Sequence, residues 1–447
     1  MKKTLYRILA LALAVMLAGC AVPAASPTAS KNAGARRDAV DSADLTFHTM
    51  EYPAIDEDIT LPYPAGIEAS VSGMSVTRPP AEVRAVWISF LEFERILTNK
   101  TERQFTASIQ KMFGTSKDFG LNTVIVQVRP FGDALYRSSY FPWSHTITGT
   151  EGRNPGFDPL EIMVREAKSR GLRIEAWVNP YRIRPVNRNN PLSSSNPARR
   201  WIESGDEAVI RHGGMISYNP ASTKAQNLIV SGVVEIVNNY DVDGIHIDDY
   251  FYPVTDASFD KSSYDRYVEN GGRLPLADWR RANVETLIKK MYDGIKKTNR
   301  NVLFGISPQS SVYNNYHAQY LDVKKIASTP GYFDYICPQI YFGYNNQAQP
   351  YHDTLKEWER MVTAPGVKLY VGLAAYKIGR QDSWAGDRGM HEFVRNDDLM
   401  KRKTQDARKV KNYGGVVIFR YDSLFAPERD VAPIVNREAG NLKSLFT

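Results

Sequence analysis

The chain has 447 residues, of which 43% are hydrophobic and 23% charged. This composition is typical of a globular protein and excludes a disordered, collagen-like or polytopic membrane protein. The formal net charge is +7 at pH 7, but basic and acidic residues are interleaved, so we expect no nucleic-acid partner. The length allows about three domains or one large α/β barrel, and the order of the predicted elements must decide between them.

The N-terminus predicts export. Two lysines and an arginine precede the ten apolar residues 8–17, a stretch too short for a membrane-spanning helix of about 20 residues but typical of a signal-peptide core. The run Leu17-Ala18-Gly19-Cys20 resembles the bacterial lipobox, in which the cysteine is acylated after cleavage. We therefore predict a lipoprotein signal peptide over 1–19 and a lipid anchor on Cys20 that attaches the protein to a membrane. An ordinary secretory signal with a chance cysteine is the alternative.

Residues 20–80 are rich in Ala, Pro, Ser and Asp and show no sustained hydrophobic period. They predict a flexible linker between the anchor and a folded domain over 81–447, although 59–63 could form a short strand. The second cysteine is Cys337. Because acylation would occupy Cys20, no intramolecular disulfide is expected.

Beyond residue 81, β-rich runs alternate with helical patterns. Thr101 and Gln104 form a capping box ahead of a helical apolar stripe, and Asp158-Pro159 opens a second helix that Gly171 closes. The predicted strands are 83–89, 123–128, 173–179, 244–248, 303–307, 335–341, 369–374 and 416–421. Eight such units predict a (β/α)8 TIM-type barrel with enlarged loops. A doubly wound open sheet is the alternative, but no Gly-rich phosphate turn follows any strand, so no nucleotide cofactor is expected.

Polar residues on the inward face of a barrel strand indicate where chemistry takes place. On the fourth strand Ile245 and Ile247 should face the helices, which directs His246 and Asp248 inward and leaves Asp249 at the carboxyl edge. The same alternation predicts further inward or rim residues on the other strands: Gln127 and Arg129, followed by Asp133, then Glu175, Trp177, Asn179, Gln339 and Tyr341.

Each of these residues also has a structural interpretation. Glu175 could form a buried ion pair with Arg129 or Arg173. His246 is better explained by hydrogen bonding than by metal binding, because the seven histidines show no ligand spacing and Cys337 has no thiolate partner. We therefore expect no preformed metal site.

Asp248 and Asp249 stand side by side at the predicted mouth of the barrel. Two neighbouring carboxylates repel each other when both are ionised, so one should have a raised pKa and could donate a proton near neutral pH. We predict a catalytic role for at least one of them.

Several runs together resemble the family-10-like glycosyl hydrolases, a group of exported bacterial (β/α)8 proteins and lipoproteins. The resemblance covers about residues 81–435 and implies glycosidase chemistry on cell-wall polysaccharide, with peptidoglycan glycans stripped of stem peptides as one substrate. The runs that carry it are 122–136 with Arg129 and Asp133, 176–182 with Asn179 and Arg182, 243–253 with Asp248 and Asp249, 305–308, and 338–341 with Gln339 and Tyr341.

Glycoside hydrolysis normally uses two carboxyl groups on opposite sides of the scissile bond. The ends of the fifth to seventh strands offer no Glu, so the partner of the Asp248/Asp249 pair is sought, in falling order, among Asp133, Glu175, Glu92 and Asp422. The other possibility is substrate assistance, in which an acetamido oxygen attacks the anomeric carbon while one Asp polarises the acetamido N–H and the other protonates the leaving oxygen. That route requires the chain to bend at Asp249.

Aromatic residues in the loops could stack on sugar rings, although about half of them should simply pack loops onto the barrel rim. The candidates are Tyr136, Tyr140, Phe141, Trp143, Tyr181, Tyr250, Phe251, Tyr252, Tyr341 and Tyr344. Four polar residues could bind hydroxyl or carboxylate groups of the glycan: Arg129, Asn179, Arg182 and Gln339. Trp177 and His246 are further candidates for substrate binding.

We therefore expect a membrane-anchored glycosidase of the bacterial cell envelope that acts on peptidoglycan glycan. A non-catalytic glycan-binding lipoprotein and a metal-assisted hydrolase using His246, Asp248 and Asp249 are the alternatives. Ala21 follows Cys20, and the absence of an Asp at this position favours the outer membrane, facing the periplasm, where two membranes exist. In a cell with one membrane the protein would lie on its outer face.

Overall fold

The computed structural model describes residues 79–186 and 191–446. The chain divides into the units 1–67 and 68–447, and all the described residues belong to the second. The predicted signal peptide, Cys20 and the strand proposed for 59–63 lie outside the described residues. No helix among the described residues is long and apolar enough to cross a bilayer.

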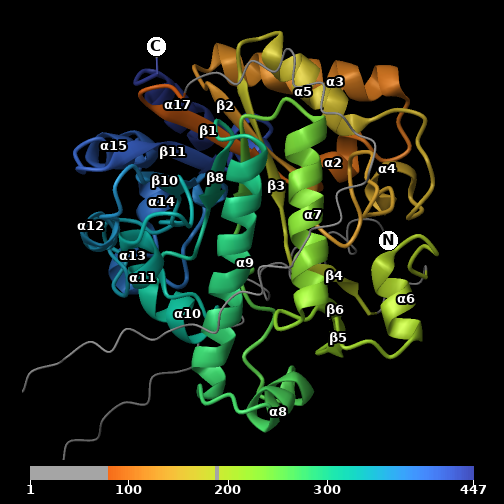
Figure 1. The fold of residues 1–447 in the computed structure, drawn as a ribbon. Coiled ribbons are helices and arrows are strands. Elements are labelled where there is room, and N and C mark those ends of the chain that lie inside the picture. Colours follow the sequence, from red (N-terminus) through yellow and green to blue (C-terminus); the bar gives the residue numbers. More distant parts are fainter. Residues whose placement is uncertain (1–78, 187–190, 447) are drawn as a thin grey trace, which may run out of the picture. The chain divides into compact units, whose positions relative to one another are not determined.

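Eight parallel strands close into a barrel (Figure 1). They follow one another around the barrel in chain order, and the last pairs with the first through Val83 opposite Gly415. This confirms the predicted (β/α)8 fold. The barrel strands are β1 (Val83–Ile88), β2 (Thr123–Arg129), β3 (Arg173–Val178), β7 (Gly244–Ile247), β8 (Leu303–Ile306), β9 (Tyr335–Ile336), β10 (Lys368–Ala374) and β11 (Tyr413–Phe419).

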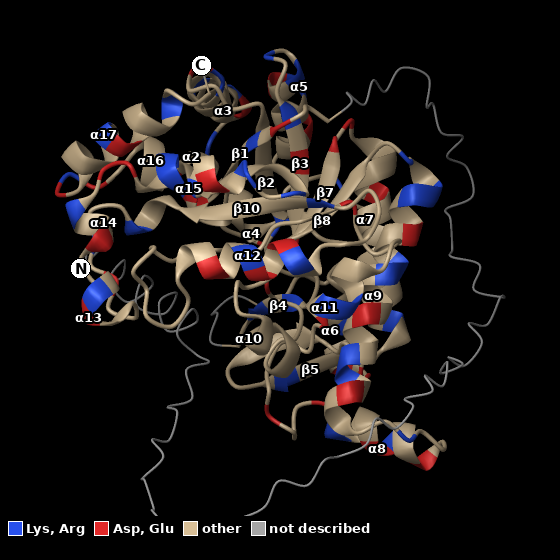
Figure 2. Cartoon of the chain, turned by 90° about the vertical axis from the view of Figure 1, so that its left-hand side faces the viewer, with Lys and Arg blue, Asp and Glu red and all other residues tan. Residues whose placement is uncertain are grey.

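Helices surround the strands, and the longest three are α3 (Glu102–Asp118), α7 (Thr223–Asn239) and α9 (Leu276–Thr298). In Figure 2 the ribbon of α9 carries both blue (Lys, Arg) and red (Asp, Glu) positions. The other helices are α2 (Phe90–Ile96), α4 (His145–Thr148), α5 (Pro159–Lys168), α6 (Pro197–Glu203), α8 (Lys261–Glu269), α10 (Val312–His317), α11 (Val323–Ser328), α12 (Tyr351–Met361), η1 (Ala375–Lys377), α13 (Gly386–Gly389), α14 (Glu392–Arg395), α15 (Leu399–Ala407), α16 (Tyr421–Phe425) and α17 (Ala432–Lys443).

The predicted helix N-termini are capped by the side chains that the sequence indicated. Thr101 and Gln104 form the reciprocal capping box of α3, and the Asp158 side chain accepts from the first backbone amides of α5. Such caps satisfy amides that have no partner within the helix. Both helix starts are therefore confirmed.

The alternation within β7 separates two hydrophobic cores. Ile245 and Ile247 pack in the large core between strands and helices, whereas His246 points into the barrel with Trp177 of the smaller interior core. The strands therefore direct alternate side chains to the two cores as predicted.

The eighth barrel strand, predicted at 416–421, begins and ends earlier, and Tyr421 opens α16 instead. Two further differences bear on the site. The sixth barrel strand ends at Ile336, because Pro338 has no N–H to continue the ladder; only a single bridge between Gln309 and Gln339 lies beyond it. In β2 the register shifts between Gln127 and Arg129, so that Arg129 pairs with Val178. This bulge reverses the predicted inward direction of Arg129, because Val178 belongs to the outer core.

A three-stranded antiparallel sheet is inserted between β3 and α7, and the sequence did not predict it. Its strands are β4 (Arg182–Pro185), β5 (Val209–His212) and β6 (Met215–Tyr218). In Figures 1 and 2 this sheet lies below the barrel, at the same end as α8 and α10. Since β4 follows the carboxyl end of β3 closely, the insertion borders the mouth of the barrel.

Candidate active site

Asp248 and Asp249 follow the last residue of β7, between the ends of β3 and β8. Asn179, directly after β3, donates from Nδ2 to Asp248 Oδ1 at 2.6 Å. Gln309, beyond β8, donates from Nε2 to Asp249 Oδ2 at 3.2 Å. The two carboxylates therefore turn toward opposite neighbouring strands while remaining at one strand end.

A chain of amides determines the orientation of Asn179. The backbone N–H of Phe90 donates to Gln127 Oε1 at 2.9 Å, which leaves Gln127 Nε2 to donate to Asn179 Oδ1 at 2.5 Å. Asn179 must then present its NH₂ group to Asp248. Three strands and the start of α2 thus cooperate to hold one carboxylate.

Both carboxyl groups are poised to retain a proton. Burial, followed by the neighbouring Asp249, raises the pKa of Asp248 to about 7, although Arg182 and Asn179 oppose the shift. Burial also raises the pKa of Asp249, against hydrogen bonds from Gln339 and Gln309. Two close carboxyls titrate as a unit, and both shifts favour retention of a proton by the pair.

Arg182 lies beside this pair within an aromatic cluster. Its guanidinium carbon is 4.8 Å from the ring centres of both Phe131 and Tyr250. Its Nε donates to the carbonyl of Pro130 at 2.9 Å, which fixes the side chain. A held guanidinium at a carboxylate pair can also receive an anionic substrate group.

A second aromatic cluster lies across the barrel, where β11 is opposite β7 in the strand order. Tyr341 stacks on Phe419 with ring centres 5.9 Å apart, and Tyr376 meets Phe419 edge-on at 6.0 Å. All three rings are partly exposed. One group of aromatic rings therefore lies beside the carboxylate pair, and a second lies at the opposite side of the barrel.

Beneath the mouth, a buried relay fills the barrel. Trp87 Nε1 donates to His246 Nε2 at 3.1 Å, so the imidazole hydrogen is on Nδ1, which donates to the Tyr335 hydroxyl at 2.8 Å. Tyr335 in turn donates to Glu175 Oε2 at 2.5 Å. Burial lowers the pKa of His246 to about 3 and raises that of Glu175 to about 7, so the histidine is neutral.

Glu175 lies in a different layer from the Asp248/Asp249 pair. It pairs in register with Gly244, the first residue of β7, and its carboxyl packs where a Cβ on Gly244 would be. The buried residues Trp177 and His246 occupy the layer between. The structure therefore does not bring Glu175 to the rim beside the pair.

Asp133 is buried and interacts with His145, whose Nδ1 lies 2.5 Å from Asp133 Oδ2. Burial opposes ionisation of Asp133, but its contacts with His145 outweigh burial and lower the pKa. Arg129 is directed into the outer core, with its guanidinium carbon 4.5 Å from the centre of the Phe141 ring. Neither residue has a direct contact with the Asp248/Asp249 pair among the described interactions.

The two remaining carboxylate candidates have other partners. Glu92 caps α2 through Ser89 and pairs with Arg420, while Asp422 pairs with Arg95 at 2.7 Å. Of the ten loop aromatics expected to line the site, half are buried in the outer core, as the packing interpretation predicts. The buried five are Tyr136, Phe141, Tyr181, Phe251 and Tyr252.

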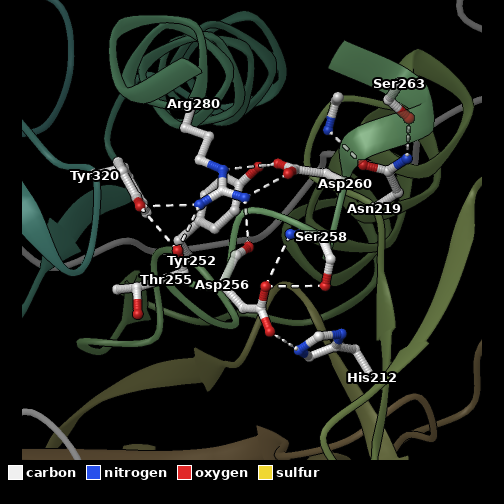
Figure 3. A network of polar contacts seen from close by, with 11 residues as sticks. His212, Asn219, Tyr252, Thr255, Asp256, Ser258, Asp260, Ser263, Arg280 and Tyr320 are labelled. Carbon is white, nitrogen blue, oxygen red and sulfur yellow. Dashed lines mark hydrogen bonds and ion pairs between the residues drawn. The ribbon is translucent and has the colours of Figure 1, made fainter. Parts of the chain in front are cut away.

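A polar network anchors the loop that begins with the catalytic candidates (Figure 3). Arg280 of α9 makes two hydrogen bonds to Asp260, from Nε at 2.9 Å and from Nη2 at 2.5 Å, and both side chains are fully buried. Arg280 also donates to the carbonyls of Thr255 and Asp256. The far end of the loop is therefore tied to a long barrel helix.

Sequence reasoning missed several residues of the mouth. Gln309 is a polar residue just beyond the carboxyl end of the fifth barrel strand, as Asn179 is for the third. Its position after the strand could therefore have identified it from the sequence. Phe90, Phe131 and Phe419 carried no such signal, because an aromatic residue near a strand end is equally typical of packing. Among the described residues, no group of three or more His, Cys, Asp or Glu side chains is placed to hold a metal ion.

Comparison with known proteins identifies the family. The family described as glycosyl hydrolase-like 10 matches residues 82–386, which is most of the folded part. The chain belongs to this family. It is 36% identical over 359 residues to glycosyl hydrolase YngK of Bacillus subtilis, covering 74% of this chain and 68% of the relative. It is also 33% identical over 416 residues to glycosyl hydrolase DigH of Escherichia coli K12, covering 82% and 90%.

Solved structures support the fold of this glycosyl hydrolase-like 10 protein. The glycoside hydrolase domain of PgaB from Bordetella bronchiseptica superposes with a TM-score of 0.52 at 13% identity, over 80% of this chain and 99% of that domain. The catalytic domain of a Paenibacillus polymyxa β-amylase also gives 0.52, at 10% identity, over 83% and 100%. These likenesses show the barrel architecture, and the family membership shows that the protein is a glycoside hydrolase.

Proposed function

We propose that the enzyme hydrolyses the glycan strands of peptidoglycan, including strands stripped of stem peptides. One observation carries the proposal: the Asp248/Asp249 pair, in which both pKa values are raised, lies beside Arg182 and its aromatic cluster at the mouth of the barrel. Aromatic rings suit the C–H faces of sugars, and the guanidinium suits the lactyl carboxylate of a muramic residue that a stripped glycan exposes. The family membership supplies the reaction class.

The pair supplies the acid that glycosidic cleavage requires. We assign proton donation to the leaving oxygen to Asp249, because its side chain is partly exposed. Asp248 is 7% exposed and held by Asn179, which suits it to accept a hydrogen bond from the substrate. Gln339, Tyr250 and Tyr341 would contact the sugars from the rim, and the buried residues Asn179, Trp177 and His246 would support the site from below.

The mechanism that fits these positions is substrate-assisted. The acetamido oxygen of the cleaved sugar attacks the anomeric carbon, Asp248 accepts the acetamido N–H, and the glycosidic C–O bond breaks as Asp249 gives its proton to the leaving oxygen. Water, which gives a proton to the Asp249 carboxylate, then attacks the anomeric carbon and breaks its bond to the acetamido oxygen, so that Asp249 is protonated again. This route is favoured because Glu92, Asp133, Glu175 and Asp422 each have other partners. A conventional partnership with Asp133 or Glu175 is the competing route.

We further propose that the protein acts as an exported lipoprotein of the cell envelope, held by acylated Cys20. The support is the apolar run 8–17 followed by Leu17-Ala18-Gly19-Cys20. Two or more acyl chains give stable anchoring. This arrangement would place the barrel on the side of the membrane where peptidoglycan lies.

The decisive experiment is mass spectrometry of products from peptidoglycan glycans with and without stem peptides. We expect new reducing ends and short muramic-acid-containing fragments from the stripped strands. Release of no fragments, while another polysaccharide is cleaved, would exclude the proposed substrate class. The same digestion in chelator distinguishes a metal-assisted reaction, which would stop and resume on addition of a divalent metal.

A further inference from the structure

Two aromatic side chains project from the loops around the barrel mouth. Among the described residues, five large apolar side chains are exposed, and the two aromatic ones are Tyr313, 70% exposed, and Trp384, 67% exposed. Tyr313 lies on α10, after β8, and Trp384 lies between η1 and α13, after β10. Both follow carboxyl ends of barrel strands, the end at which the Asp248/Asp249 pair lies.

Both aromatic residues are connected to the segment 343–349, which follows β9. Ser310, three residues before Tyr313, donates from Oγ to Gln349 Oε1 at 2.9 Å. The backbone N–H of Gln347 donates to the carbonyl of Ala385, the residue after Trp384, at 3.0 Å. The segment therefore bridges the two loops. Figures 1 and 2 place α10 and α13 in the lower half of the molecule, away from the C-terminus.

The bridging segment is rigid and displays amides. Buried Glu392 accepts from the backbone N–H groups of Tyr344 and Asn345 at 2.9 and 2.8 Å. Asn346 Oδ1 accepts from the next two free backbone amides, those of Ala348 and Gln349. The side chains of Asn345 and Gln347 are exposed on this fixed backbone. Because the backbone is already held by these hydrogen bonds, binding would cost little additional backbone entropy.

The ring of Tyr313 is also held in place. The imidazole of His317, one helical turn later, lies 4.3 Å from it between ring centres. One face of Tyr313 is therefore covered, and the other is available. We call Tyr313, Asn345, Gln347 and Trp384 the outer platform.

The outer platform is connected to the active site through hydrogen bonds. Gln309 hydrogen-bonds Asp249, and the next residue, buried Ser310, holds Gln349 of the bridging segment. The loops that carry the two exposed rings are therefore held in place relative to the carboxylate pair. Both lie at the carboxyl ends of the barrel strands, the side from which a polymer would approach the pair.

We propose that the outer platform binds sugars of the glycan strand away from the bond that is cleaved. The rings of Tyr313 and Trp384 would stack on sugar C–H faces, and the amides of Asn345 and Gln347 would bind hydroxyl and acetamido groups. Separate rings with amides between them suit a ligand that alternates apolar faces and polar groups, whereas a protein partner needs a contiguous apolar patch. This inference rests on the proposed peptidoglycan substrate and deepens it.

The test compares long and short substrates. Trp384→Ala and Tyr313→Ala should each raise KM for long peptide-free peptidoglycan strands about tenfold, the equivalent of one good aromatic contact, with kcat unchanged. KM for a tetrasaccharide of the same sugars should not change, because so short a ligand does not reach the platform. Val394→Ala is the matched control, since Val394 is also exposed, at 40%, and lies outside the platform. Equal KM values for wild type and both aromatic variants on long strands would overturn the inference.

Binding assays separate this inference from the proposed function. Wild type and variants are sedimented with peptidoglycan sacculi, chitin and cellulose. If wild type cleaves no peptidoglycan glycan, the proposed function fails. The outer platform is then supported if Trp384→Ala or Tyr313→Ala loses binding to one of these polysaccharides, and overturned if binding is as strong as that of the Val394→Ala control.

Discussion

Asn179 Nδ2 donates to Asp248 Oδ1 at 2.6 Å. The direction of this hydrogen bond is determined by Phe90 and Gln127, because Gln127 donates to Asn179 Oδ1 and leaves only the NH₂ group of Asn179 for Asp248. The hydrogen bond stabilises the charged carboxylate and lowers the pKa of Asp248 against burial. Asn179 thereby lowers the pH at which the pair loses its proton.

Replacing Asn179 should move the pH profile. The pair must carry its proton to act as an acid, so activity falls as the pH rises through the upper pKa of the pair, whose two members both have raised pKa values. Asn179→Ala removes a group that favours ionisation, so this alkaline limb should shift to higher pH while the rate at the optimum falls. The measurement is kcat/KM against pH on stripped glycan. An unchanged limb would show that Asn179 does not tune the pair.

Removing either acidic group should stop turnover. We expect Asp248→Asn and Asp249→Asn each to lower kcat by at least about 100-fold, the scale of lost acid–base catalysis. Both variants should remain folded, because each carboxylate is held by a neutral amide and no ion pair within 79–186 and 191–446 includes either of them. Circular dichroism and reducing-end assays check this expectation. Near-normal rates in both folded variants would place the catalytic centre elsewhere.

Substrate assistance predicts dependence on the acetamido group. A glycan with N-deacetylated sugars at the cleaved position should bind but turn over poorly, and a thiazoline mimic of the cyclic intermediate should inhibit. Asp133→Asn and Glu175→Gln should then retain turnover. Full activity on the deacetylated glycan, or a severe defect in Asp133→Asn without thiazoline inhibition, would favour the conventional two-carboxylate route.

Glu175 should make stability depend on pH. Burial raises its pKa from 4.5 to about 7 in the folded protein, so between these values the native state binds more protons than the unfolded state. Its contribution to stability is therefore complete below about pH 4.5 and is lost as the pH rises toward 7. Glu175→Gln should raise the melting temperature at pH 8 by roughly 2–4 °C and have little effect at pH 4.5. Calorimetry at the two pH values checks this, and an equal effect at both would show that Glu175 is ionised throughout.

The anchor has its own test. Cys20→Ala should release the protein from membranes, because the proposed acyl chains would hold it there. Fractionation of cells producing wild type and variant measures the distribution. The variant remaining in the membrane pellet would refute the lipoprotein proposal.

The inward direction of Asp248 could be predicted from the sequence, because Ile245 and Ile247 are apolar and must face the helices. Arg129 was misplaced because the same rule fails at a bulge, and nothing in the local sequence marks the register shift opposite Val178. Pro338 was a visible signal that the sixth strand should be short. The hydrogen-bond polarity of Gln127 and Asn179 depends on Phe90, which is distant in sequence, and could not be predicted from composition or period.

The peptide bond between Asp248 and Asp249 lies at the boundary between the first four and the last four barrel strands. The support for Asp248 comes from Gln127 and Asn179, in the first four strands, whereas that for Asp249 comes from Gln309 and Gln339, in the last four. Neither half of the barrel contains a complete acid pair with its supporting amides. A polypeptide that contains only the first four strands would therefore lack glycosidase activity. The complete site forms only when the two halves of the barrel pack together.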